Sequence, residues 1–198
     1  MNLSIRPLTN QFHPAYLRFF DERAFSDGSP NGPCYCTSPS MDEASIRQMV
    51  SEFGSDTKGT HRRYAVDLLA ADKIHGYLAF EGDEPIGWCN AGDLDLYANV
   101  GFGAEMTEFI KANACGKTMS VVCFAIAPGY RGKGIAAALL NRVITDAREK
   151  GFHAVEGYPQ MSDGRSDLDY NGPIHLFRKV GFEEIAQKGN RLIMRKEL

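Results

Sequence analysis

The most constraining feature of this sequence is a strand, a helix and a second strand that follow one another between residues 119 and 158. Met119–Ala127 is β-branched and apolar, which is typical of a strand buried on both faces. Gly151 is placed to end the helix, and Ala154–Tyr158 fits the next strand. Such a unit requires two parallel strands joined by a right-handed crossover. The helix between them is indicated by apolar residues that recur with helical spacing, namely Ala136, Leu139, Leu140, Val143, Ile144 and Ala147.

The rest of the chain fits elements that pair mostly antiparallel. We expect further strands at 3–8, His75–Phe80, Pro85–Asn90, Glu183–Ala186 and Arg191–Arg195. We expect helices from Pro14, from a capping box of Ser40 and Glu43 to Gly54, at 62–71, at 105–112, and from Pro173 to Gly181. Loops are expected at 26–40 and 162–171. The prediction is one α/β domain, residues 1–198, with a mixed, mostly antiparallel sheet flanked by helices.

Charge and composition exclude several classes of protein. Lys+Arg 22 against Asp+Glu 25 gives a net charge of −3, which argues against a basic surface for nucleic acid. The longest apolar runs fall far short of the roughly 20 residues that span a bilayer, and the N-terminal segment lacks the apolar region of a secretory signal. Cys34 and Cys36 have no further Cys or His pair for a zinc site. We therefore expect a cytoplasmic protein without a metal, a nucleic acid partner or a membrane contact.

The turn between the first buried strand and its helix carries the chemistry. Gly132 and Gly134 allow positive φ and leave room for a ligand beside the backbone. The helix that follows presents unpaired N–H groups, which favour a phosphate or pyrophosphate. Arg131 and Lys133 add positive charge there. The segment does not fit the Walker A motif. Residues 132–137 do fit the dinucleotide pattern G-x-G-x-x-A, with Glu156 near the position of the residue that binds ribose. However, too little chain remains for the doubly wound sheet that this pattern requires.

Two segments resemble the GCN5-related N-acetyltransferases. Arg131-x-x-Gly134-x-Ala136, between a strand that ends before Pro128 and an apolar helix, is similar to the (Q/R)-x-x-G-x-(G/A) motif of that family. Leu176–Phe182 is similar to its second motif, L-Y-x-K-x-G-F. The resemblance implies that acetyl-CoA lies between two parallel strands that splay apart, and that its acetyl group passes directly to an amine.

The resemblance also implies roles for individual residues. Backbone groups of Phe124, Ala125 and Ile126 would pair with the pantetheine arm, and the Ile126 N–H would stabilise the tetrahedral oxyanion. The pyrophosphate would lie on the turn formed by Arg131, Gly132, Lys133, Gly134, Ile135 and Ala136.

The sequence departs from the family pattern at the groups that move protons. Phe177 stands where the second motif usually has a Tyr acid, and 121–126 contains no carboxylate. Tyr170 is the candidate substitute acid. Asp93 is the first candidate base, and the alternatives are Asp95, His75, His175 and Glu156. Cys123 lies in a buried apolar strand and is expected to be an inert core residue.

The sequence is compatible with three functions. The leading prediction is an acetyl-CoA-dependent N-acetyltransferase for a small-molecule amine or a peptide, with a homodimer left open. A non-catalytic acyl-CoA-binding or regulatory module is the alternative that the missing Tyr favours. A dinucleotide-binding enzyme is the third. The choice of acceptor is expected to depend on 26–40 and 91–117, where Asp93, Asp95 and Glu105 hint at a cationic acceptor.

Overall fold

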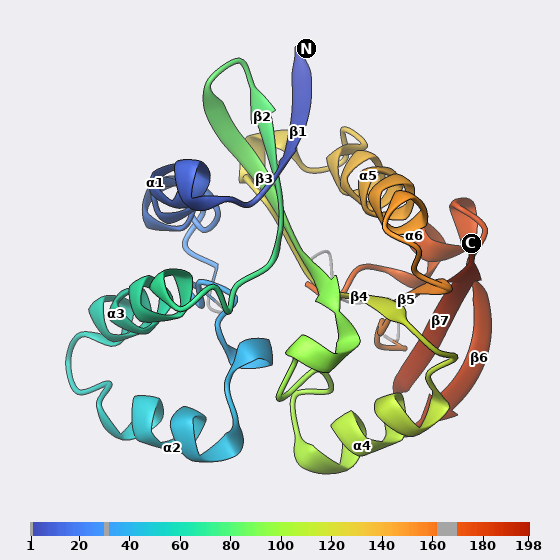
Figure 1. Ribbon diagram of the computed structural model, residues 1–198. Helices are drawn as coiled ribbons and strands as arrows, with labels where there is room; N and C mark the ends of the chain where they lie inside the picture. The colour runs from blue at the N-terminus through green and yellow to red at the C-terminus, as the bar shows by residue number, and fades with distance from the viewer. Residues whose placement is uncertain (1, 30–31, 162–169) are drawn as a thin grey trace.

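The computed structural model describes residues 2–29, 32–161 and 170–198, and in this part of the chain seven strands form one sheet (Figure 1). Their order across the sheet is β1-β2-β3-β4-β5-β7-β6. The pair β4–β5 is parallel and every other neighbouring pair is antiparallel. This confirms the predicted mixed, mostly antiparallel sheet. The strands are β1 (Leu3–Pro7), β2 (Gly76–Glu81), β3 (Glu84–Asp93), β4 (Thr118–Ile126), β5 (Ala154–Gly157), β6 (Glu183–Lys188) and β7 (Arg191–Glu197).

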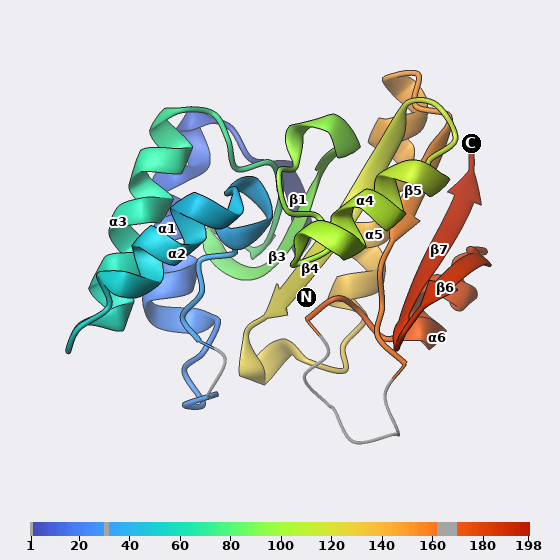
Figure 2. The same cartoon turned by 90° about the horizontal axis from the view of Figure 1, so that it is seen from below.

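Helices flank the sheet on both sides (Figures 1 and 2). One side carries α1 (His13–Arg18), its π-helical continuation η2 (Phe19–Arg23), α2 (Glu43–Ser51) and α3 (Thr57–Ala70). The other side carries α5 (Ile135–Glu149) and α6 (Ile174–Lys179), while α4 (Ala104–Asn113) packs beside the β6–β7 hairpin. Short 3-10 turns join these elements, namely η1 (Asn10–Phe12), η3 (Ser38–Ser40), η4 (Leu94–Leu96) and η5 (Pro128–Tyr130).

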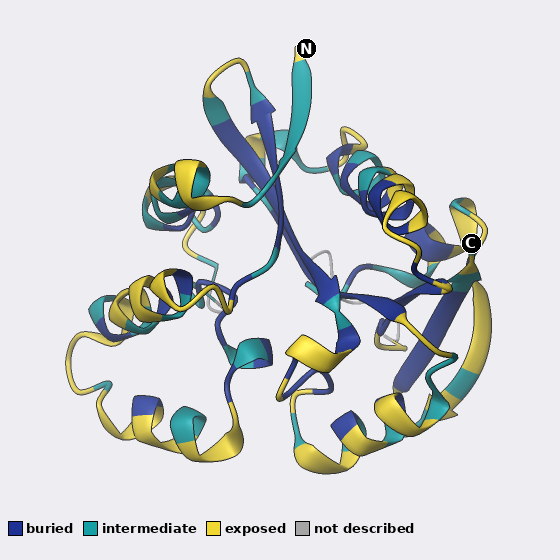
Figure 3. Ribbon diagram, viewed as in Figure 1, coloured by how far each residue is buried: buried dark blue, intermediate teal, exposed yellow. Residues whose placement is uncertain are grey.

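The unit β4–α5–β5 has the predicted structure. All but one of the apolar residues that indicated the helix are buried on α5, and they pack against the sheet. The exception, Ala136, is partly buried at the helix start, beside the turn. Gly151 has φ +69° directly after the helix, as a C-terminal glycine in the left-handed region should. Figure 3 shows that β2, β3, β4, β5 and β7 form the buried centre and that the outer helix faces are exposed, while β1 is intermediate and β6 is mostly exposed.

Two helix starts differ from the prediction. Asp42, rather than Ser40, caps α2, because its carboxylate accepts a hydrogen bond from the Ser45 N–H at 2.7 Å. The capping box of Ser40 and Glu43 is therefore wrong, and Ser40 lies in η3. Asp56 caps α3 in the same way, so that helix begins five residues earlier than expected. Ser and Asp are nearly equal as N-caps, and the sequence alone does not rank them.

The parallel pair opens at a β-bulge. Asn90 of β3 pairs with Cys123, but Ala91 pairs with Val121, so Val122 is an extra residue in β4. Pairing between β4 and β5 ends at Val121. Beyond that point β4 stays with β3, whereas the chain after β5 follows β7 through a Leu192 N–H bond to the Pro159 carbonyl. A bulge bends and twists its strand, so the two parallel strands splay apart where the family resemblance expects them to.

Two further points concern the described residues. The loop predicted at 162–171 lies outside them except for Tyr170 and Asn171. Within the described ranges, no helix is long and apolar enough to cross a membrane.

Candidate functional site

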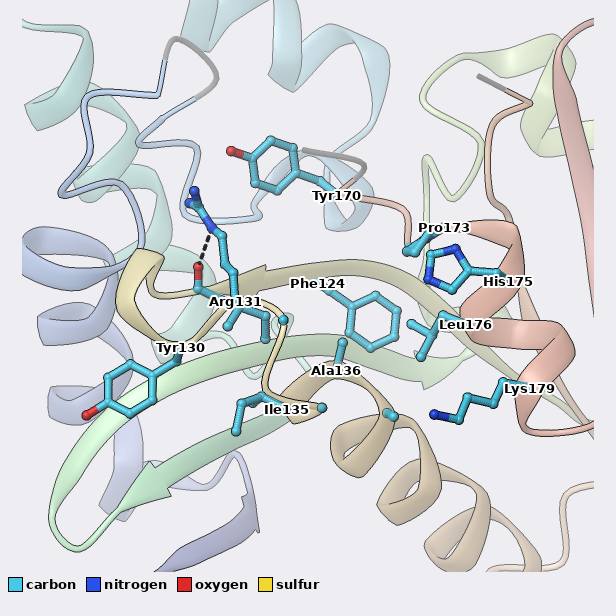
Figure 4. Close-up of a pocket in the computed structure, with 15 residues that line it drawn as sticks. Phe124, Tyr130, Arg131, Ile135, Ala136, Tyr170, Pro173, His175, Leu176 and Lys179 are labelled. Carbon is cyan, nitrogen blue, oxygen red and sulfur yellow. Dashed lines mark hydrogen bonds between the residues drawn. The ribbon is translucent and has the colours of Figure 1, made fainter. Parts of the chain in front are cut away.

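A cleft of about 370 Å³ opens between the end of β4, the turn after it, the start of α5 and the start of α6 (Figure 4). Its volume lies in the range of small-molecule sites, roughly 300–1,000 Å³. Seven of the nine residues predicted to bind the cofactor line this cleft, and they are Phe124, Ile126, Arg131, Gly132, Gly134, Ile135 and Ala136.

The start of α5 is built for an anion. Gly134 is its N-cap with φ +80°, and no side chain caps the helix. The Ala138 N–H makes the bond back to the Gly134 carbonyl, so the N–H groups before it have no partner inside the helix. A Cβ atom placed on Gly132 or Gly134 would meet nothing within 4 Å, so this side of the turn is open. These N–H groups and the helix dipole together fit a phosphate.

Arg131 lines the cleft, but its guanidinium group is engaged elsewhere. Nη1 lies 2.5 Å from the Asp27 carboxylate, Nε donates to the Ile126 carbonyl at 3.1 Å, and Nη2 reaches the Ala24 carbonyl at 3.4 Å. Figure 4 shows the side chain extending from the turn toward the side of Tyr170 and away from Ala136. The Arg131 side chain therefore ties 24–27 to the turn, which differs from the expected contact with a pyrophosphate. Because of this bond, the pKa of the Asp27 carboxyl is lowered.

Other cations differ in their relation to the cleft. Lys179, on α6, lines it, and Figure 4 shows this side chain directed toward the start of α5. Lys133 does not line it and instead has its Nζ 5.2 Å from the centre of the Tyr130 ring. The glycine turn pointed to Lys133 as the cation at the pyrophosphate and not to Lys179, although Lys179 is the lysine of the second motif.

Along β4 the backbone N–H and C=O groups of successive residues point alternately toward β3 and toward the opposite edge of the strand. The Ala127 N–H donates to the Ile86 carbonyl of the adjoining chain at 3.0 Å, and Ala125 is paired with Trp88. Because antiparallel pairing alternates, the groups of Phe124 and Ile126 face the opposite edge, which β5 has left. The expectation that Ala125 offers backbone groups to a cofactor is therefore wrong. No described residue accepts a hydrogen bond from the Ile126 N–H.

Tyr170 lies at the end of the cleft nearest the bulge. Its main-chain carbonyl accepts a hydrogen bond from the Phe124 N–H at 2.6 Å. Its hydroxyl lies 2.9 Å from Ser29 Oγ, and its ring contacts Phe25. Tyr170 thus joins the segment of Phe25 and Ser29 to the edge of β4.

Phe177 stands where the second motif usually has Tyr, but its side chain does not reach the surface of the cleft. Its side chain is fully buried, and it packs against Phe124 and Phe182. A Cβ atom on Gly157 of β5 would lie 2.1 Å from Phe177 Cε1, so the ring rests directly on that glycine. The ring at this position fills the core between α6 and β5.

The structure separates most base candidates from the cleft. Asp93 is paired with Met119 at the far end of β4, whereas Ile126 is at the cleft, seven residues or roughly 23 Å along the strand. Asp93 instead accepts a hydrogen bond from the Asp95 N–H and lines a second hollow with His75. Asp93, Asp95 and His75 are therefore not placed to take a proton from an amine in the cleft. His175 lines it.

Glu156 is fully buried and paired. It accepts a hydrogen bond from Arg195 Nε at 2.7 Å and one from the Tyr158 hydroxyl at 3.2 Å, and that hydroxyl lies 2.7 Å from Ser120 Oγ. Burial raises the pKa of Glu156, and the hydrogen bond from Arg195 opposes this rise. These contacts make Glu156 part of the packing between β4, β5 and β7.

The cysteines are free thiols among the described residues. Burial raises the pKa of Cys89, and hydrogen bonding to Cys36 together with burial raises the pKa of Cys123. In the part of the chain that the structure covers, no group of three or more His, Cys, Asp or Glu side chains is arranged to hold a metal ion.

Comparisons with known proteins agree with this geometry. The model of a family described as the Acetyltransferase (GNAT) family matches residues 41–182. The search of curated protein sequences found no match.

Solved structures share the fold at low sequence identity. An N-acetyltransferase from Thermoplasma acidophilum, in complex with coenzyme A, is 16% identical with a TM-score of 0.54, covering 100% of both chains. The protein yncA from Salmonella typhimurium, solved with acetyl-CoA, is 15% identical with a TM-score of 0.54, covering 100% of this chain and 94% of that one. A ribosomal-protein-alanine N-acetyltransferase from Brucella melitensis is 20% identical with a TM-score of 0.51, covering 98% and 99%.

Proposed function

The chain belongs to the GNAT acetyltransferase family, and from this premise we propose that it transfers an acetyl group from acetyl-CoA to an amine of a small molecule or a peptide. One observation carries the proposal. The uncapped start of α5 and the edge of β4 at Ile126, which β5 has left, open into the same cleft. A ligand that fits both needs an anionic group at one end and a polar, extended arm at the other, and acetyl-CoA has both.

The residues present fit such a ligand. N–H groups at the start of α5, beside Gly132 and Gly134, would hold the pyrophosphate, and Lys179 would add positive charge from α6. The edge of β4 at Ile126 would pair with the arm. The bound ligand supplies an acetyl group activated as a thioester.

In the proposed reaction the amine nitrogen forms a bond to the acetyl carbon, and the carbon–sulfur bond breaks. The Ile126 N–H, which has no acceptor among the described residues, would donate to the carbonyl oxygen as negative charge develops there. The nitrogen loses one proton, and the sulfur gains one. His175 is the base candidate placed at the cleft to accept the first proton.

Tyr170 is the proposed donor of the second proton. A thiolate whose conjugate acid has a pKa of about 8.5 leaves with modest help, and a positioned acid contributes about 10²–10⁴-fold. Tyr170→Phe removes only the hydroxyl, so we expect kcat to fall at least about tenfold. An unchanged kcat would assign the proton to water.

The non-catalytic acyl-CoA-binding alternative is supported by the absence of the usual Tyr, since Phe177 is a core residue. The dinucleotide alternative lacks support, because the described sheet has one parallel pair rather than a doubly wound arrangement.

One experiment separates these functions. Acetyl-CoA is incubated with the protein and a panel of amines, and free thiol is measured, alongside thermal shifts with acetyl-CoA, CoA and NAD(H). We expect stabilisation by acetyl-CoA and CoA, and amine-dependent thiol release. Stabilisation without release for any amine would favour the binding module, and stabilisation by NAD(H) alone would overturn the proposal.

A further inference from the structure

Cys36 and Cys123 meet in the core on the side of the sheet that α1 and α3 cover. Cys123, on β4, is the cross-strand partner of Asn90 on β3. The Asn90 side chain extends to Cys36, where Nδ2 donates to Sγ at 3.3 Å and to the carbonyl oxygen at 3.2 Å. The two thiols are hydrogen bonded to each other, and both are buried. Residues 87 positions apart in the chain thus bring two sulfur atoms together.

The groups around the Cys36 sulfur favour a negative charge there. The Asn90 amide and the Cys123 thiol both donate to it. Trp88 Nε1 is buried next to Cys36 and has no hydrogen-bond partner among the described residues. Hydrogen bonding from Cys123 lowers the pKa of Cys36, and the bond from Asn90 adds to this, although burial acts in the opposite direction. A buried donor without a partner is unfavourable, so a thiolate beside the Trp88 N–H supplies what this donor lacks.

The backbone at 35–36 holds Cys36 in an unfavourable conformation. Tyr35 has φ +45° and Cys36 has φ +49°, in the left-handed region that residues with a Cβ atom rarely adopt. The Tyr35 hydroxyl donates to the Asp21 carboxylate at 2.5 Å, and Asn90 binds the Cys36 carbonyl from the other side. Strain of this kind persists only where the surrounding structure imposes it, and it is concentrated at functional sites. These contacts therefore fix the Cys36 sulfur against Cys123.

The other cysteines near this pair are less suited to react. Cys34 is half-buried, and burial raises the pKa of its thiol to about 12. Cys89 has 0% of its surface exposed, and burial raises its pKa as well. Cys36 keeps 4% of its surface exposed, which leaves a point of contact for a molecule as small as hydrogen peroxide. Because the thiolate is the reactive form of cysteine, Cys36 is the residue of this group that an oxidant attacks first.

We propose that Cys36 and Cys123 form a reversible disulfide when the protein meets a hydroperoxide. The Cys36 sulfur bonds to one peroxide oxygen, the O–O bond breaks, and Cys36 becomes a sulfenic acid. The Cys123 sulfur then bonds to the Cys36 sulfur, the S–O bond breaks, and the hydroxyl leaves as water with the Cys123 proton. In total the two thiols lose two electrons and two protons, and hydrogen peroxide is reduced to two molecules of water.

The disulfide would join the segment at 34–37 to β4 directly before Phe124, a residue that lines the cleft. Cys123 reacts only in the second step, which agrees with a buried thiol that is itself no nucleophile. The inference does not depend on the proposed function, because the bond forms between groups of the folded chain whatever the cleft binds.

Peptide mapping of the folded, full-length protein tests the pair. The protein is treated with hydrogen peroxide, the remaining thiols are blocked with N-ethylmaleimide in denaturant, and the tryptic peptides are weighed. Trypsin releases Cys36 within 24–47 and Cys123 within 118–131. We expect these two peptides as a linked pair that lacks two hydrogen atoms and that dithiothreitol separates. Absence of the linked pair at a peroxide concentration that oxidises the half-buried Cys115 would overturn the proposal.

Variants identify the sulfur atoms and the donor. Cys36→Ser should abolish the linked pair, and its matched control Cys34→Ser should keep it, because both cysteines lie in the same peptide. A pair that survives in Cys36→Ser would overturn the proposal. Asn90→Ala keeps both thiols and removes a donor to Cys36, so the pair should form severalfold more slowly. Equal or faster formation in Asn90→Ala would overturn Cys36 as the first thiol to react. The wild-type peptide map needs no variant, so it decides the question even where a variant does not fold.

Discussion

Replacing Gly134 with alanine separates the ligand-binding role of the turn from its role in folding. Gly134 has φ +80° at the N-cap of α5, and a Cβ atom there would meet nothing within 4 Å. The substitution therefore causes no clash with the protein. Its two effects are strain in the backbone and a methyl group in the space where a phosphate would approach the helix start.

The two effects have different sizes. A non-glycine residue in the left-handed region costs about 1–2 kcal/mol, and this cost appears in the free energy of unfolding. A methyl group that keeps a phosphate from one N–H removes a hydrogen bond to a charged group, worth about 1.5–3 kcal/mol. With 1.4 kcal/mol per factor of ten, the Kd of CoA should rise about 10- to 150-fold.

Gly189 provides the matched control. It has φ +58° in the β6–β7 turn, and a Cβ atom there also meets nothing within 4 Å. Gly189→Ala should lose a similar amount of stability and keep wild-type affinity for CoA. Urea denaturation measures the first quantity, and titration calorimetry at a temperature where both variants are folded measures the second.

Equal affinities of the two variants for CoA would refute a phosphate at this turn. A Gly134→Ala protein that binds CoA within about twofold of the wild type would show that phosphate does not approach this turn. A loss of affinity in both variants would show that reduced stability, and not the methyl group in the cleft, weakens binding.

Three further predictions concern packing and charge. Gly157→Ala places a Cβ atom 2.1 Å from Phe177 Cε1, so the free energy of unfolding in urea should fall by at least about 1–3 kcal/mol; an unchanged value would contradict the packing described. Arg195→Met leaves the Glu156 carboxylate buried without its partner and should cost about 3–5 kcal/mol at pH 7. Loss of Arg195 removes the hydrogen bond that opposes the rise of the Glu156 pKa through burial, so the pKa of this carboxyl is raised further in the variant. The loss of stability should therefore shrink as the pH falls toward about 4.3, and a loss that grows on acidification would refute it. Arg131→Gln should change the Kd of CoA less than about threefold, since the Arg131 guanidinium binds Asp27. A loss of affinity for CoA of about tenfold would show that this side chain does contact the pyrophosphate.

Much of the site follows from local sequence patterns. The strand–turn–helix unit is indicated by the apolar period of 136–147, the two glycines of the turn and the cap at Gly151. Each of these features acts over a few residues and does not depend on the rest of the fold. For the same reason the start of the cleft at 131–136 was predictable from the sequence.

Contacts between distant residues were decided by the tertiary structure. Its place after a predicted strand made Asp93 the first candidate base, yet the β3–β4 register sets it opposite Met119, far from the cleft. Ala125 and Ile126 are neighbours in the chain, but pairing with β3 turns the groups of Ala125 away from the cleft. Register depends on which residues of two strands meet, and no local pattern encodes it.

Local sequence patterns predict most of the elements, their order and the glycine turn after β4, because propensity, capping and periodicity are local properties. The tertiary structure decided the bulge at Val122, the bond of Arg131 to Asp27, and the position of Tyr170 between Ser29 and Phe124. Each of these joins residues that are distant along the chain or depends on how two strands align. Their partners become known only when the sheet and loops have packed, since a polar group bonds to whatever the fold brings within about 3 Å.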